Sequence, residues 1–179
     1  IFCSIFNGEE FLEGYFENVL EQTLFQEVNF YFLDNASTDN TWGMVEKFAE
    51  KYRNVYSRRL EKDKGLYAGW NECINWTKEP YLGNWNVDDR KNPWSLEVLL
   101  RQLQRDSSID LVYGKTLVTT KPNDKWHTSE ANKVFPIEAP SLESLLRNNS
   151  PHCMPIWKRS LHDQFGQFDE KYLTASDTD

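Results

Sequence analysis

The sequence lacks any run of about 18 apolar residues, so no segment of it would cross a bilayer as a helix. It holds only three cysteines, Cys3, Cys73 and Cys153, and none of them stands in a C-x-x-C pair. These absences argue against a disulfide framework and against a thiolate zinc site. No signal-peptide pattern is present either. We therefore expect a cytoplasmic protein and, because Ile1 already lies in an apolar run, a piece of a longer chain.

Basic residues are in the minority. Twenty Lys and Arg stand against 28 Asp and Glu, which leaves a net charge of -8. A protein that binds the phosphate backbone of nucleic acid needs the opposite balance, so nucleic acid is not the expected partner. An acidic protein that takes an anionic ligand needs a local positive charge, and a divalent cation held by carboxylates supplies one.

Apolar and aromatic residues are present in the amount that one folded domain needs. They make up 39% and 15% of the 179 residues, whereas disordered chains have few of either. A chain of this length is typical of one domain. We therefore expect residues 1–179 to form a single domain.

Strand and helix patterns alternate along the first 118 residues. Runs rich in apolar and β-branched residues predict strands at residues 1–6, 28–33, 54–57, 81–87 and 110–118. Apolar residues spaced three and four apart predict helices at residues 9–22, 45–52, 66–76 and 93–103. Successive strand and helix units predict an α/β fold, a three-layer sandwich of Rossmann type with a mostly parallel central sheet.

The alternation stops after residue 118. Residues 119–140 show no period and predict a long connection, a kind of segment that is usually functional or mobile. A short helix over residues 141–148, a strand over residues 153–157 and a turn-rich segment over residues 165–172 are expected to follow.

Polar side chains follow three of the predicted strands. Asn7 follows the first, Asp34 and Asn35 the second, and Asp88 and Asp89 the fourth. Ligands of open α/β sheets bind beyond the carboxyl ends of the strands, and a strand order such as 3-2-1-4 would line one crevice with these residues. For each position alone, the preference of Asp and Asn for caps and turns is the favoured explanation. Two adjacent carboxylates, however, repel each other unless a cation lies near them, which favours a metal site.

Five segments resemble, in order, the successive signatures of glycosyltransferase family 2. They are residues 5–12, 32–41, 65–71, 85–89 and 168–179. The resemblance covers nearly the whole chain and implies a GT-A fold. It implies a donor half at about residues 1–118 and an incomplete acceptor-side segment at about residues 119–179. The implied reaction is inverting transfer of a sugar from a nucleotide diphosphate donor to a hydroxyl acceptor.

The resemblance also implies a nucleotide-sugar site. Its expected members are Phe6, Asn7, Glu9, Asp34, Asn35, Gly65, Asn71 and Asp88. Phe6 would form an apolar wall beside the base. Asp34 would accept hydrogen bonds from base N–H groups, because an ionised carboxylate only accepts. Trp70 stands at helical spacing with Leu66 and Ile74, so we expect it in the core and not on a ligand.

Metal and base roles follow from the same resemblance. Asp88 and Asp89 match the acidic metal motif of the family; Asp88 would contact the ribose as well. The ligand of Mn²⁺ or Mg²⁺ is expected to be Asp89 first, with the cation bridging the diphosphate oxygens. Asp177 matches the catalytic base that takes the proton of the acceptor hydroxyl.

Two other functions stay open. A nucleotide-sugar-binding or degenerate domain would keep the donor crevice without turnover. A sugar nucleotidyltransferase has a similar sheet, but it would need a Gly- and Arg-rich loop after the first strand, where residues 7–10 are acidic. For the transferase, the expected acceptor is a glycan or lipid-linked saccharide of polysaccharide biosynthesis, which would place the protein at the inner face of the membrane.

Overall fold

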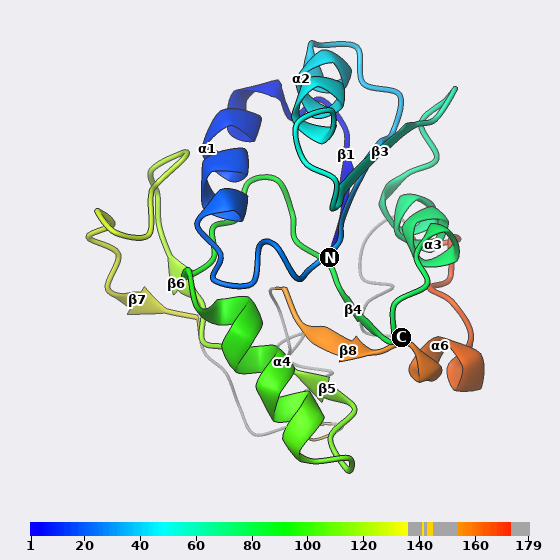
Figure 1. The fold of residues 1–179 in the computed structure, drawn as a ribbon, viewed down its shortest axis with the longest axis vertical. Coiled ribbons are helices and arrows are strands. Elements are labelled where there is room, and N and C mark those ends of the chain that lie inside the picture. The colour runs from blue at the N-terminus through cyan, green and yellow to red at the C-terminus, as the bar shows by residue number, and fades with distance from the viewer. Residues whose placement is uncertain (136–140, 142, 145–153, 173–179) are drawn as a thin grey trace.

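Three parallel strands form the centre of the molecule. The computed structural model describes residues 1–135, 141, 143–144 and 154–172. The central strands are β1 (Phe2–Ile5), β2 (Phe30–Asp34) and β3 (Val55–Arg59), in the order β1-β2-β3. Figure 1 shows them among the surrounding helices.

A second group of strands extends the sheet past β1. It contains β4 (Tyr81–Gly83), β8 (Ile156–Lys158) and β5 (Leu111–Val112), and β8 is antiparallel to both of its neighbours. A parallel bridge between Phe2 and Asn84 joins the two groups. The strand order is therefore β3-β2-β1-β4-β8-β5, which contains the order 3-2-1-4 considered from the sequence.

Helices connect the strands (Figure 1). They are α1 (Glu9–Leu20), α2 (Thr41–Ala49), α3 (Leu66–Trp76), α4 (Ser95–Arg105) and the short α6 (Ser160–Phe165). A hairpin of β6 (Leu117–Val118) and β7 (Lys133–Val134) projects on the α1 side of the molecule. Among the helices that the structure describes, none is long and apolar enough to cross a membrane.

Strand β2 shows why the fold has three layers. All its residues are buried, and successive side chains point to opposite faces of the sheet. On the face of Phe32, residues of α1, α2 and α4 form one apolar cluster. On the face of Leu33, α3 packs Trp70 against Phe2, with ring centroids 6.4 Å apart. The predicted α/β sandwich and the core position of Trp70 are confirmed.

The second half of the chain differs from the sequence prediction. The strand predicted over residues 110–118 is wrong as one element, because β5 pairs with β8 and β6 pairs with β7. The connection over residues 119–140 contains β7, and the strand predicted at residues 153–157 is displaced to β8. Helix α6 was not predicted, since six residues carry too little periodicity. Most of the helix predicted over residues 141–148 lies outside the described residues.

Candidate active site

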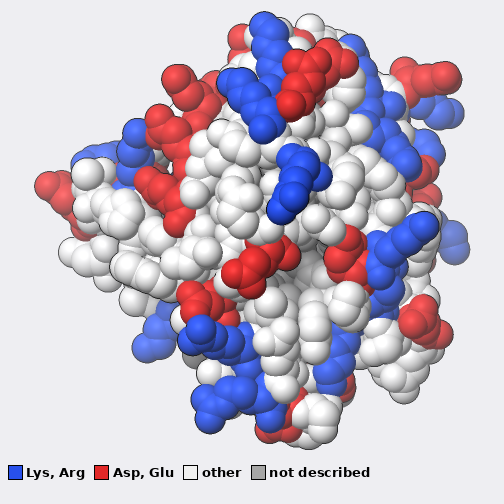
Figure 2. Space-filling view, viewed as in Figure 1, with Lys and Arg blue, Asp and Glu red and all other residues white. Residues whose placement is uncertain are grey.

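The candidate site lies where the order of the strands in the sheet reverses. Strand β1 has β2 on one side and β4 on the other, and such a switch point opens a crevice at the carboxyl ends of the strands. The segments that follow β1 and β4 touch there: a Cβ added to Gly8 would lie 2.7 Å from Ile5 Cγ2 and 3.3 Å from Val87 Cγ1. Figure 2 shows acidic and basic side chains intermixed over one side of the molecule.

The loop after β1 is bonded to the loop after β2. Asn7 has a positive φ of 50°, its Oδ1 accepts a hydrogen bond from Thr38 N at 2.8 Å, and its own N donates to Ser37 Oγ at 2.9 Å. Glu9 Oε2 accepts from Asn40 N at 2.9 Å. Phe6 is 51% exposed. Three of the predicted nucleotide-site residues therefore lie together at an accessible edge, with Phe6 offering the apolar surface.

Asp34 lies beneath this edge and is fully buried. Ser37 N donates to its Oδ1 at 3.1 Å. Arg59 Nε lies 3.0 Å from Oδ2 as an ion pair that lacks hydrogen-bond geometry. The carboxylate is therefore enclosed and already partnered, and in this structure it offers no exposed oxygen to a base N–H group.

Asn35 is buried and holds the turn that precedes α3. Its Nδ2 donates to Asp63 Oδ1 at 2.7 Å and to Gly65 O at 3.2 Å, while Lys64 N donates to its Oδ1 at 3.1 Å. Gly65 has a φ of 82°, which a residue with a side chain adopts only with strain, and no atom lies within 4 Å of where its Cβ would be. The turn thus leaves open space at Gly65, where a ligand has room.

Asn71 connects α3 to a distant part of the chain. Its Nδ2 donates to Phe168 O at 2.9 Å and to Glu170 Oε1 at 3.0 Å, and Phe168 N donates to its Oδ1 at 3.1 Å. The side chain is 3% exposed, and both its polar atoms are occupied. Asn71 therefore holds the segment that leads toward Asp177, which itself lies outside the described residues.

We expect Asn71→Ala to lower the free energy of unfolding by about 1–3 kcal/mol, because it leaves the backbone N–H and C=O of the half-buried Phe168 without their partners. Donor affinity should stay within about two-fold of the original value, since the amide is already occupied. Urea unfolding and calorimetry measure the two effects. Asn75→Ala is the matched control: this exposed residue of α3 accepts from Gln167, and its loss should change little. Loss of donor binding at unchanged stability would instead support the predicted donor contact.

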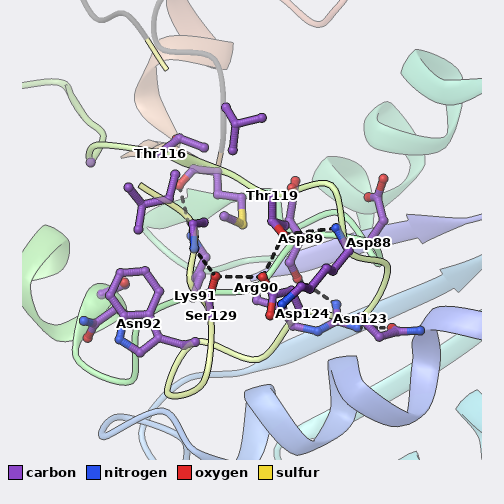
Figure 3. Close-up of a pocket in the computed structure, with 18 of the residues that line it drawn as sticks. Asp88, Asp89, Arg90, Lys91, Asn92, Thr116, Thr119, Asn123, Asp124 and Ser129 are labelled. Atoms are coloured by element: carbon purple, nitrogen blue, oxygen red, sulfur yellow. Dashed lines mark hydrogen bonds between the residues drawn. The ribbon is translucent and has the colours of Figure 1, made fainter. Parts of the chain in front are cut away.

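The two acidic residues after β4 differ in their surroundings (Figure 3). Asp88 is exposed and makes no hydrogen bond or ion pair with the residues that the structure describes. Asp89 is half-buried: its backbone N donates to Asn86 O at 3.1 Å, and Asn86 Nδ2 lies 3.4 Å from its Oδ2. The fully buried Trp85 donates from Nε1 to Asp89 O at 3.1 Å. The turn is thus fixed to the core and presents Asp88 outward.

The next residue, Arg90, is half-buried. Its Nη1 donates to the carbonyl oxygens of Val87 and Asp89, both at 2.9 Å, and its Nη2 donates to Phe11 O at 3.0 Å and Asn123 Oδ1 at 2.6 Å. Burial lowers the pKa of this guanidinium, and the nearby carboxylates oppose that shift. The group stays protonated because arginine does not titrate in the range where proteins fold.

A pocket of about 520 Å³ opens beside this turn (Figure 3). Its lining includes Asp88 and Asp89 together with Thr119, Asp124 and Trp126 from the β6–β7 hairpin region. Its volume is in the range of small-molecule sites. The carboxylate pair therefore borders a cavity large enough for a sugar-sized ligand.

The residues at the turn fit a divalent cation that a ligand completes. Among the described residues, no three His, Cys, Asp or Glu side chains gather closely enough to hold a metal by themselves. Asp88 has no basic partner within the described part of the chain. The neighbouring Arg90 donates instead to carbonyl and amide oxygens. Mg²⁺ is commonly bound by one or two carboxylates together with substrate phosphates and water. Asp88 and Asp89 match that donor set.

Sequence reasoning missed two residues that organise the site. The sequence alone assigns no role to Arg59, which pairs with the buried Asp34. It assigns none to Arg90 either, which joins three segments. A glycine in the middle of an amphipathic helix, Gly14, was the one local sign that something lies against α1 there.

Comparison with known proteins identifies the family. The model of glycosyl transferase family 2 matches residues 1–165 of the chain. An uncharacterized glycosyltransferase of Methanocaldococcus jannaschii is 23% identical over 136 residues, which cover 71% of this chain and 47% of that protein.

Solved structures show the same fold. TarS of S. aureus, residues 1–349, superposes with a TM-score of 0.76 at 19% identity, covering 99% of this chain and 52% of that one, and it is also known in complex with UDP-GlcNAc. The mannosyltransferase PcManGT of Pyrobaculum calidifontis, in complex with GDP-Man and Mn²⁺, gives a TM-score of 0.71 at 16% identity, with coverages of 99% and 48%. The chain thus spans about half the length of these proteins. Its fold is GT-A, as expected from the sequence, and the chain belongs to glycosyl transferase family 2.

Proposed function

We propose that this domain transfers a sugar from a nucleotide diphosphate donor to a hydroxyl acceptor, with inversion at the anomeric carbon and with help from Mn²⁺ or Mg²⁺. Membership of the family supports glycosyl transfer as such. The observation that carries the finer proposal is Asp88: an exposed carboxylate, held on a turn fixed to the core, at the switch point between β1 and β4.

The donor would lie across the ends of β1 and β2. TarS is known with UDP-GlcNAc and PcManGT with GDP-Man, so a sugar nucleotide is the natural ligand class to test. Phe6 and Asn7 would border the base, and Glu9 and the open space at Gly65 lie on the same edge. Asp34 would hydrogen-bond to the nucleobase only if the Arg59 side chain moved away from it. Otherwise Asp34 would support the donor crevice together with Asn35.

The cation would be held by Asp88 first and by Asp89 second. This reverses the order expected from the sequence, because Asp88 is the exposed member of the pair while Asp89 is engaged with Asn86. When bound, the metal supplies Lewis-acid stabilisation of the charge on the departing nucleoside diphosphate. Asp88 would also lie near the ribose, as the family resemblance implies.

The acceptor hydroxyl would be activated by Asp177. A base that removes its proton must lie on the face of the sugar opposite the leaving group, and attack from that face inverts the anomeric carbon. Asn71 supports this assignment, since it holds Phe168 and Glu170 just before that part of the chain. We propose a glycan or lipid-linked saccharide as the acceptor, in polysaccharide biosynthesis at the cytoplasmic face of a membrane.

Thermal shift with UDP-, GDP- and dTDP-sugars, each with and without MnCl₂, tests the proposal. A ligand that binds only the folded state raises the melting temperature, and we expect one base to do so only when Mn²⁺ is present. Proton NMR of the product, or of slow hydrolysis, should then show inverted anomeric configuration. Metal-dependent binding without transfer or hydrolysis would favour a degenerate binding domain. The absence of any donor binding would contradict the proposed function.

A further inference from the structure

We infer that Arg90 is a positioning residue for the proposed metal-binding turn after β4, which carries Asp88 and Asp89. We also infer that Gly14 leaves the room that the Arg90 guanidinium needs beside α1. The inference rests on the proposed function, because it assigns Arg90 a role through Asp88. The role of Arg90 is to fix the position of Asp88 before any cation binds.

The guanidinium joins three segments that are distant in the sequence. All four Nη hydrogens are used: two on the turn itself, at Val87 O and Asp89 O, one on α1 at Phe11 O, and one at Asn123 Oδ1 ahead of β7. The two bonds to the turn bracket Asp88. The position of this residue is therefore tied to the first turn of α1, which directly follows β1.

The hydrogen bonds of Arg90 fix the position of the turn, and none of them is an ion pair. Every acceptor of Arg90 among the described residues is a neutral carbonyl or amide oxygen, and none is a carboxylate. The planar fork of arginine can satisfy such divergent acceptors, whereas the single ammonium of lysine cannot. The role therefore depends on the shape of the side chain as well as on its charge.

Gly14 explains how the guanidinium fits against α1. A Cβ at Gly14 would lie 3.0 Å from Arg90 Nη2, 3.5 Å from Arg90 Nε and 3.5 Å from Asn123 Oδ1. A glycine within a helix costs stability relative to alanine, so its presence here calls for a reason. The reason is that the missing side chain lets the guanidinium lie close against α1, where an added Cβ would make a tight contact with it.

Binding of Mn²⁺, followed by electron paramagnetic resonance with and without UDP or GDP, tests the inference in the folded chain. We expect Arg90→Gln and Arg90→Lys each to weaken Mn²⁺ binding about ten-fold or more, the size of effect found when the groups that orient a metal ligand are removed. The direction of the change in Mn²⁺ affinity decides the matter, because a purely electrostatic role of Arg90 predicts the opposite direction. Loss of a positive charge near two carboxylates would strengthen cation binding in Arg90→Gln and leave Arg90→Lys unchanged.

Gly14→Ala narrows the space beside the guanidinium while it keeps Arg90 and every charge. We expect measurably weaker Mn²⁺ binding with little loss of thermal stability, since alanine favours the helix while it forces the guanidinium to shift by a few tenths of an ångström. Transfer by these variants should recover as Mn²⁺ is raised, which damage to the fold would not allow. Arg101→Gln, which removes an exposed positive charge on α4, is the matched control and should bind Mn²⁺ normally.

Unchanged Mn²⁺ affinity in Arg90→Lys and Gly14→Ala, or tighter binding in Arg90→Gln, would overturn the inference while the proposed function stands. If Arg90→Gln does not fold, Gly14→Ala and Arg90→Lys still decide the matter. Failure of the unmodified chain to bind Mn²⁺ with either nucleotide would contradict the proposed function, and the inference would fall with it.

Discussion

Replacing Asp88 by Asn should remove metal-dependent donor binding and lower the rate of transfer about a thousand-fold. Asparagine keeps the size of the side chain but has no charge, so a divalent cation loses its principal ligand. A bound metal contributes several kcal/mol to stabilising charge in the transition state, which corresponds to a rate effect of this order. Calorimetry of the donor with and without Mn²⁺, followed by a product assay, measures both quantities.

Asp89→Asn is the matched comparison for Asp88→Asn. Because Asp89 is half-buried and already contacts Asn86, we expect it to lose less metal-dependent affinity than the Asp88 variant. Neither change removes a buried apolar group, so both variants should fold. If Asp89→Asn abolishes the dependence on Mn²⁺ while Asp88→Asn preserves it, the order of ligands proposed from the structure is wrong and the order expected from the sequence is right.

Asp177→Asn should lower transfer by about 10²–10⁴-fold, the usual contribution of a general base. Donor affinity should stay within about two-fold, because a base acts on the acceptor and not on the nucleotide. Single-turnover transfer and donor calorimetry separate the two effects. Asp163→Asn, an exposed change in α6, is the control and should leave both unchanged. Equal loss of donor binding and transfer in Asp177→Asn would show that this residue belongs to the donor site instead.

Much of the fold was predictable because local patterns carry it. The apolar run that becomes β2 is buried on both faces, and the helical spacing around Trp70 is enough to place that residue in the core. The second half was less predictable. Strands of two or three residues such as β5 and β8 carry almost no local pattern, and their pairing depends on partners far along the chain.

The candidate site divides in the same way. The sequence indicated which residues follow the ends of the strands, and Asn7 and Asp88 do lie at one accessible edge. It did not indicate that Asp34 and Asn71 are buried and already partnered, because Arg59 and Phe168 reach them only through the tertiary fold. The difference between the two acidic neighbours after β4 likewise comes from a turn whose shape depends on distant contacts.

We propose that Asp88 holds a divalent cation at the switch point of the sheet, beside a bound sugar nucleotide. Diffraction data collected at the manganese edge, from crystals grown with MnCl₂ and the donor selected by thermal shift, test it most directly. We expect one strong anomalous peak at bonding distance from an Asp88 carboxylate oxygen and from oxygens of the donor diphosphate. A donor bound with no such peak, or with manganese on other side chains, would contradict the account.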